Sequence, residues 1–301
     1  MSGAADAESG KGEAADGPGP DADGHRPGVL IRRPRRGDPV VAVSVAVAST
    51  VLFFGAIAWA VVTAPDFPRV QRAFLNGPLF EESLPEVVRA FQTNIKLFLI
   101  AEVLVLFFGL VLAVMRSLPG PVFFPLRLLA VAYTDLLRGL PGILVIFLLG
   151  FGVPGLNIEG VPNDPFFWAV VALTMIYAAY VSEVYRAGIE SVHPSQEAAA
   201  RSLGLRRSQA LRYVILPQAV RRIVPPLLND FLGLQKDTVL VSFIGVVEIF
   251  RASQIKQAGN FNFTPYLATA LVFIVVTVPL ARLTDYLVTR SRRGQARGGF
   301  R

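Results

Sequence analysis

The stretch "EAAARSLGLRRSQALRYVILPQA", Glu197 to Ala219, is charged, contains one glycine and lies between long apolar runs. Its first half continues a segment that begins at Pro194, a residue favoured in the first turn of a helix. Glu197 and Arg201 have the i, i+4 spacing of a favourable charge pair on that helix. Gly204 is expected to end the helix, because glycine tolerates the left-handed conformation at a helix C-terminus.

The second half of the stretch predicts another short helix, from Arg207 to Leu216. Leu211, Val214 and Ile215 fall on one face of this helix, and the basic residues fall on the other. Pro217 is expected to stop the helix, since proline cannot donate the hydrogen bond that a helix interior needs. From this pattern alone, the segment is an amphipathic connector whose arginines lie among anionic lipid head groups.

The composition around this stretch is that of an integral membrane protein. Of 301 residues, 53% are hydrophobic and 17% are charged, too apolar a balance for an ordinary soluble domain. The formal net charge is +7, but the basic residues lie between apolar runs, which indicates membrane orientation and not a nucleic-acid partner. The chain has no cysteine, which excludes disulfides and thiolate metal sites.

Six apolar runs are each about long enough to cross a hydrocarbon core of about 30 Å. The expected spans are Val40–Thr63, Leu97–Met115, Leu128–Val153, Phe166–Tyr185, Ile223–Val247 and Tyr266–Val288. A cleaved signal peptide is the competing interpretation of the first run, which is longer than the usual apolar core of a signal. The fold class predicted is therefore all-α and integral to the membrane.

An even number of spans places both termini on one side. Most Lys and Arg residues outside the spans fall on the segments of that side, so the positive-inside rule makes it the cytoplasmic side. We therefore expect five segments. They are a disordered cytoplasmic tail over 1–38, an additional span over 39–64, an outer loop over 65–92, a core over 93–289 with a cytoplasmic loop over 190–218, and a basic cytoplasmic tail over 290–301. The outer loop is either a short interfacial helix or a plain connector.

Charged residues inside spans are costly and usually face a cavity or a partner. Lys236 and Asp237 interrupt the fifth span, where they line a pathway or form ion pairs with neighbouring helices. Glu102 lies midway along the second span and either faces a cationic substrate group or hydrogen-bonds a neighbouring helix. Asn229 follows two prolines that loosen the start of the fifth span and free backbone carbonyl groups. These residues are the candidates for a translocation pathway.

The quoted stretch resembles the EAA loop of ABC importer permeases in residue type and in spacing. The matching residues are Glu197, Ala198, Ala199, Gly204, Ile215, Leu216 and Pro217. Three further blocks resemble the branch of that family that imports polar amino acids of the histidine, glutamine, glutamate, arginine and opine class. They are "LLRGLPGILVIFLLGFG" (136–152), "SEVYRAGIESV" (182–192) and "RRIVPPLLNDFLGLQKDTVLVSFIGVVE" (221–248).

The resemblance implies a type I ABC importer transmembrane fold, with a five-helix core to which this chain adds one N-terminal helix. It implies that the loop docks on a cytoplasmic ATPase, and it makes Thr238, with Lys236 and Asp237, part of the pathway or its gate. The chain has no phosphate-binding Gly-x4-Gly-Lys-Ser/Thr loop, so it should bind no cofactor itself and is not an enzyme. ATP and magnesium should be bound by the partner.

The partners expected from the resemblance are two ATPase copies, a second copy of this chain or a sister permease, and an extracytoplasmic amino-acid-binding protein, all at a bacterial cell membrane. Two other classes of protein stay open. An ion-coupled secondary transporter would use Glu102 or Asp237, but it leaves the EAA loop unexplained. A membrane scaffold would not need charges inside the bilayer.

Overall fold

A computed structural model describes residues 39–298 of the chain, with side chains described to residue 290. The expected disordered tail, 1–38, lies outside the described residues, as do the side chains of most of the expected basic tail. The chain forms two units, Met1–Ala64 and Pro65–Arg301. The described part of the first unit contains α1, Pro39–Val62, which has the length and composition of a membrane span, as predicted.

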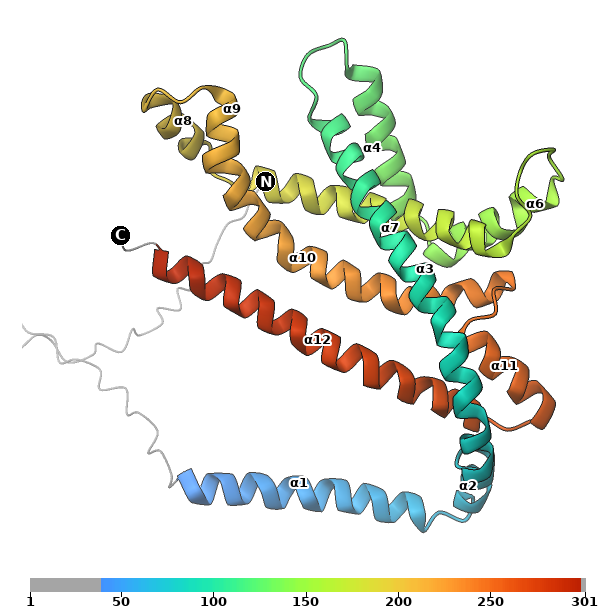
Figure 1. Ribbon diagram of the computed structural model, residues 1–301. Coiled ribbons are helices and arrows are strands. Elements are labelled where there is room, and N and C mark those ends of the chain that lie inside the picture. Colours follow the sequence, from blue (N-terminus) through green and yellow to red (C-terminus); the bar gives the residue numbers. More distant parts are fainter. Residues whose placement is uncertain (1–38, 299–301) are drawn as a thin grey trace, which may run out of the picture. The chain divides into compact units, whose positions relative to one another are not determined.

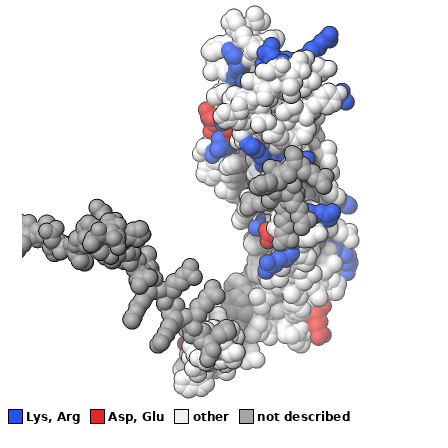
Figure 2. Space-filling model, turned by 90° about the vertical axis from the view of Figure 1, so that its left-hand side faces the viewer, with Lys and Arg blue, Asp and Glu red and all other residues white. Residues whose placement is uncertain are grey.

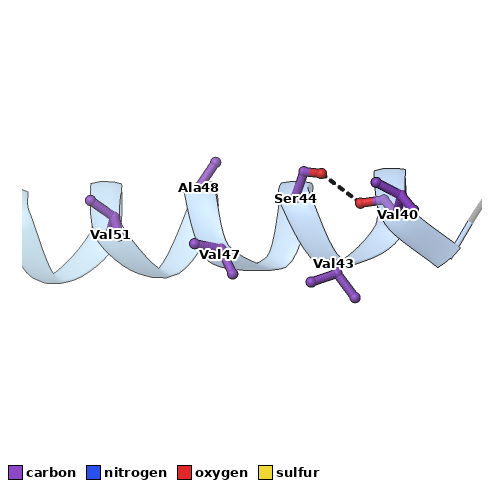
Figure 3. A pocket seen from close by; sticks show the side chains of 6 residues that line it. All are labelled: Val40, Val43, Ser44, Val47, Ala48 and Val51. Atoms are coloured by element: carbon purple, nitrogen blue, oxygen red, sulfur yellow. Dashed lines mark hydrogen bonds between the residues drawn. The ribbon is translucent and has the colours of Figure 1, made fainter.

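Helix α1 is apolar on every side, and its side chains are exposed along its whole length. The shallow groove in Figure 3 runs along one of its faces. It is lined by Val40, Val43, Ser44, Val47, Ala48 and Val51. The only polar side chain there, Ser44, donates its hydroxyl to the carbonyl oxygen of Val40 one turn earlier. The surface of α1 therefore suits a lipid environment.

The second unit begins with α2, Phe67–Phe74, and α3, Gly77–Ser117. The amide nitrogen of Leu79 donates to the Asn76 side chain at 3.2 Å, which caps α3 at its first turn. Much of the segment expected to be an outer loop is thus helical. The stretch around Pro85, part of the outer loop expected to be a short interfacial helix or a plain connector, continues directly into the apolar part of α3.

The third predicted span is not one straight helix. Helix α4, Phe124–Gly139, is followed by α5, Gly142–Phe147, the π-helix η1, Leu148–Gly152, and α6, Val153–Gly155. The two parts are bent by 106°. Proline disfavours helical backbone in the preceding residue, and Leu140, directly before Pro141, is extended at φ −93° and ψ 140°. The prediction of a continuous span over Leu128–Val153 is therefore wrong at this position.

Helix α7, Pro165–Glu190, extends the fourth predicted span. The loop over 190–218 contains α8, Pro194–Ser202, and α9, Arg207–Ala210. The π-helix η2, Leu211–Ile215, then leads into α10, Leu216–Asp237. The expectation that Pro217 stops the helix is wrong, because Pro217 lies in the first turn of α10, where the wider π turn before it makes the missing N–H less costly.

The 3₁₀ helix η3, Thr238–Ile244, α11, Ile249–Asn260, and α12, Thr264–Gly298, complete the described chain. Figure 1 shows α3, α7, α10 and α12 as the long helices of this unit, and each packs against the next. Its main core lies where α3, α7 and α10 meet. It includes Leu97, Ala101, Leu173, Ile176 and Leu234. Four described helices can span a membrane, or six if each bent pair counts as one span.

Candidate functional site

The loop over 190–218 contains a short helix with well-defined ends. The backbone N–H of Ser195 donates to His193 Nδ1 at 3.2 Å and caps α8, and Pro194 occupies its first turn. Gly204 ends the helix with φ +85°, in the left-handed region, as the sequence predicts. The chain then reverses into α9, where the backbone N–H of Arg206 donates to Gln209 Oε1 at 2.8 Å.

The outer face of α8 is small and apolar, and it is surrounded by charge. Ala198 and Ala199 are exposed, whereas Ala200 is buried against the rest of the loop. Glu197 pairs with Arg207 Nε at 3.9 Å and not with Arg201, so the predicted i, i+4 pair is wrong. The ion pair of Glu197 therefore joins α8 to α9 and does not lie within α8. Leu203 at the tip is 85% exposed.

Basic side chains lie among uncharged ones at the top of the view in Figure 2. The exposed basic side chains on this loop are Arg201, Arg206, Arg207 and Arg212. The surface thus combines exposed alanines, one exposed leucine and a positive surround. Such a surface can pack closely against a partner that carries an apolar depression with acidic edges.

The loop continues directly into α10. Ile215, Leu216 and Pro217 lie where η2 passes into α10 without interruption. The Gln218 side chain donates to the carbonyl oxygen of Val214 at 3.0 Å and to Gln196 Oε1 at 3.4 Å, which connects the start of α10 to α8. These hydrogen bonds and the unbroken helical backbone connect α8 to the start of α10.

The other end of α10 carries the predicted charged pair. Asp237 accepts a hydrogen bond of 2.8 Å from the Tyr177 hydroxyl of α7, and Lys236 is exposed. Thr238 is buried and hydrogen-bonded to Asn94 of α3 at 3.0 Å. Within the described residues, neither Lys236 nor Asp237 forms an ion pair. This argues against the alternative that the two residues form structural ion pairs with neighbouring helices.

Glu102 and Asp230 form a second group of polar side chains between α3 and α10. Both are half-buried, and they lie within electrostatic range of each other. The Glu102 side chain does not form the expected hydrogen bond with a described residue. Asp230 Oδ2 is also buried without a hydrogen-bond partner among the described residues. Asn229, the neighbouring candidate, is exposed. The structure thus brings Glu102 close to Asp230 but leaves Lys236 on another part of α10.

Sequence reasoning missed a charge cluster near the loop. Glu183 on α7 pairs with Arg116 of α3, with Arg138 of α4 at 3.5 Å and with Arg186 at 2.8 Å. Its side chain is 17% exposed and that of Arg116 is 12% exposed, so the pair is largely shielded from solvent. Opposite charges near the same end of three spans are the signal that could have predicted this cluster. It fixes the ends of α3, α4 and α7 to one another.

A family model described as "Binding-protein-dependent transport system inner membrane component" matches residues 106–293. The chain is 37% identical to the probable glutamine ABC transporter permease protein GlnM of Bacillus subtilis (strain 168), over 60% of this chain and 82% of that protein. It is 34% identical to the glutamate/aspartate import permease protein GltK of Escherichia coli O157:H7, over 69% of this chain and 95% of that protein.

Two solved structures are similar in fold. One is titled "Crystal structure of an amino acid ABC transporter with histidines"; the TM-score is 0.63 and the identity 33%, covering 68% of this chain and 94% of that one. The other is an inward-facing structure of the MetNI methionine ABC transporter, with a TM-score of 0.54 and an identity of 16%, covering 68% of this chain and 95% of that one. The second likeness supports the fold alone.

Proposed function

The chain belongs to the family of binding-protein-dependent transport system inner membrane components, and on that premise we propose that it carries a polar amino acid into the cell. It is the permease subunit of an ABC importer with an all-α, multi-pass fold. Its own chain is not the enzyme of the system. We propose that ATP, with magnesium, is bound and hydrolysed by a separate ATPase subunit.

The observation that carries the coupling part of this proposal is the continuous path from α8 to α10. Glu197, Ala198 and Ala199 are the proposed contacts with the ATPase, and Gly204 sets the angle between the loop helices. Ile215, Leu216 and Pro217 transmit the movement, because η2 joins α10 there without a break. ATP-driven closure of the partner then shifts the permease between outward-open and inward-open states.

The proposed substrate class rests on the relatives and on the polar groups of α3 and α10. The permease relatives named above are glutamine and glutamate/aspartate importers, and the solved structure at 33% identity is an amino acid transporter. A free amino acid carries one ammonium and one carboxylate group. Glu102 suits the ammonium group, and Lys236 suits the carboxylate. Asn229, Asp237 and Thr238 are the other proposed pathway or gate residues.

We propose the usual set of partners for such a subunit. Two ATPase copies bind on the cytoplasmic side, and a second copy of this chain or a sister permease completes the pore. An extracytoplasmic binding protein delivers the amino acid. Both termini are proposed to be cytoplasmic, in a bacterial inner membrane, since the basic segments lie on that side.

The test is transport by the complete complex in proteoliposomes. ATP inside the vesicles should drive uptake of one polar amino acid in the presence of the binding protein, and Lys236→Ala should reduce that uptake while the ATPase stays bound. Full activity of Lys236→Ala would remove this residue from the pathway. Uptake driven by an ion gradient without any ATPase would instead favour the secondary-transport alternative.

A further inference from the structure

Three polar side chains with almost no exposure meet at the bend between η3 and α11. Asn94 of α3 is 2% exposed, and Thr238 and Glu248 are both 0% exposed. Asn94 Nδ2 donates to Thr238 Oγ1 at 3.0 Å and to Glu248 Oε2 at 2.9 Å. Asn94 Oδ1 accepts from the backbone N–H of Ile249 at 3.0 Å. Both amide hydrogens and the carbonyl oxygen of Asn94 are therefore in use.

The Glu248 carboxyl group accepts hydrogen bonds but forms no ion pair with a described residue. It caps α11 by accepting from the backbone N–H groups of Phe250 at 3.1 Å and Arg251 at 2.8 Å, in addition to Asn94. Three N–H groups thus donate to the Glu248 carboxyl group at the N-terminus of α11. The cluster is a buried polar network in which Asn94 and Glu248 have all their partners, an arrangement that specifies one geometry.

The hydrogen bonds of Asn94 reach both sides of the bend. Thr238 lies before Gly245, which has φ +92°, and Glu248 lies after it, where the chain turns by 47°. The far side is anchored independently. Lys256 pairs with Glu82 and Glu86 of α3 at 3.0 and 3.1 Å.

The segment before the bend, which contains Thr238, is held by fewer side-chain bonds to other helices. The Thr238 hydroxyl has one other bond to a described residue, to the carbonyl oxygen of Gln235 in its own helix. The side-chain hydrogen bond that connects Thr238 to a different long helix is thus the one from Asn94. Loss of that bond removes the side-chain hydrogen bond between η3 and α3, and the packing of η3 in the core remains.

We infer that Asn94 is a positioning residue that holds Thr238, and with it Lys236 and Asp237, at a fixed place relative to α3 and α11. The inference rests on the proposed role of these three residues in the pathway or its gate. In this role Asn94 acts on transport through the positions of Thr238 and Glu248 and not by contact with the substrate.

The experiment uses a charge exchange between Asn94 and Glu248 in the complete complex. Asn94→Asp removes the amide that donates to Thr238 and Glu248 and places two carboxyl groups side by side in a fully buried site, so uptake should fall about tenfold or more. The double variant Asn94→Asp with Glu248→Gln restores an amide–carboxylate pair and should recover about half of the lost uptake or more. Ser83→Ala is the matched control, because Ser83 is equally buried on α3 but bonds only to Leu79 of the same helix.

A second measurement separates positioning from general stability. Because the chain has no cysteine, Lys236→Cys gives one defined thiol whose maleimide labelling rate reports on the local structure. Asn94→Asp should change that rate severalfold below the unfolding temperature, the double variant should restore it, and Ser83→Ala should leave it unchanged. Wild-type labelling in Asn94→Asp, or a double variant no better than Asn94→Asp alone, overturns the inference. Absence of ATP-driven uptake by the wild-type complex counts against the proposed function, while the labelling still tests the inference.

Discussion

The Tyr177 hydroxyl of α7 donates a hydrogen bond of 2.8 Å to Asp237 Oδ2 at the end of α10. The contact is closely packed, since a Cβ atom on Gly233 of α10 would lie 3.1 Å from the same hydroxyl oxygen. A charged side chain inside a span is thereby connected to a neighbouring helix by one neutral donor. The position of Asp237 depends on that donor more than on any ion pair with a described residue.

Tyr177→Phe should impair transport without dissociating the complex. Removal of the hydroxyl leaves the half-buried carboxylate of Asp237 without this partner, at a cost of about 1–3 kcal/mol. The measurement is ATP-driven uptake in proteoliposomes, with ATPase binding checked by co-purification. Tyr180→Phe is the control on the same helix, because the Tyr180 hydroxyl makes no hydrogen bond to a described residue. Equal uptake in the two variants would show that the Tyr177–Asp237 bond is dispensable.

Glu183→Gln should destabilise the permease strongly. Glu183 holds Arg116, Arg138 and Arg186, and loss of its charge leaves the largely buried Arg116 without a counter-charge, at a cost of about 3–5 kcal/mol. The midpoint of thermal unfolding in detergent measures this. Glu190→Gln removes a pair whose carboxylate side chain is 62% exposed, so its effect should stay below about 1 kcal/mol. Similar midpoints for both variants would contradict the role of Glu183.

The sequence predicts the helical class, four of the six spans and the ends of α8 well, because long apolar runs and a single glycine have few alternative structures, but its third and fifth spans are bent helix pairs in the structure. It fails at Pro141 and Pro217 in opposite ways. One proline breaks a span by 106°, and the other is accommodated in the first turn of a helix after a π segment. Which outcome occurs depends on the packing around the residue, and that information is not local.

The candidate site also has one part that can be predicted from the sequence and one that cannot. The charges at Glu102, Lys236 and Asp237 stand out in apolar spans and are found from the sequence. The partners of Asp237 and Thr238 are not, because Tyr177 and Asn94 are ordinary residues that become important only through contacts with residues 60 and 144 positions away. Such contacts arise from the tertiary fold and leave no periodic pattern in one sequence.

Gly188→Ala should disturb the packing of α7 on α10. A Cβ atom at Gly188 would lie 2.0 Å from Ile223 Cγ1 and 2.8 Å from its Cδ1. Such overpacking in a buried contact costs about 1–3 kcal/mol. We expect a thermal midpoint lower by roughly 5 °C. Adding Ile223→Ala removes the two clashing atoms and should regain part of the loss. Gly55→Ala, where nothing lies within 4 Å, should leave the midpoint unchanged. A Gly188→Ala protein as stable as the wild type would refute the close contact.

Gly204→Val should uncouple the permease from its ATPase while leaving it inserted in the membrane. A Cβ atom at Gly204 meets nothing within 4 Å, so the effect arises from the backbone, whose φ of +85° is costly for a β-branched residue.

Gly204→Asn is the matched comparison, because asparagine tolerates the left-handed conformation better, and it should retain more ATPase binding and uptake than the valine variant. Ala199→Asp tests the surface and not the angle, since Ala199 is exposed on α8 and its replacement adds bulk and charge at the proposed contact. Co-purification of the ATPase and ATP-driven uptake are measured for all three. If the valine and asparagine variants lose activity equally, the conformation of Gly204 is not what sets the coupling, and if Ala199→Asp binds the ATPase normally, α8 is not the docking surface.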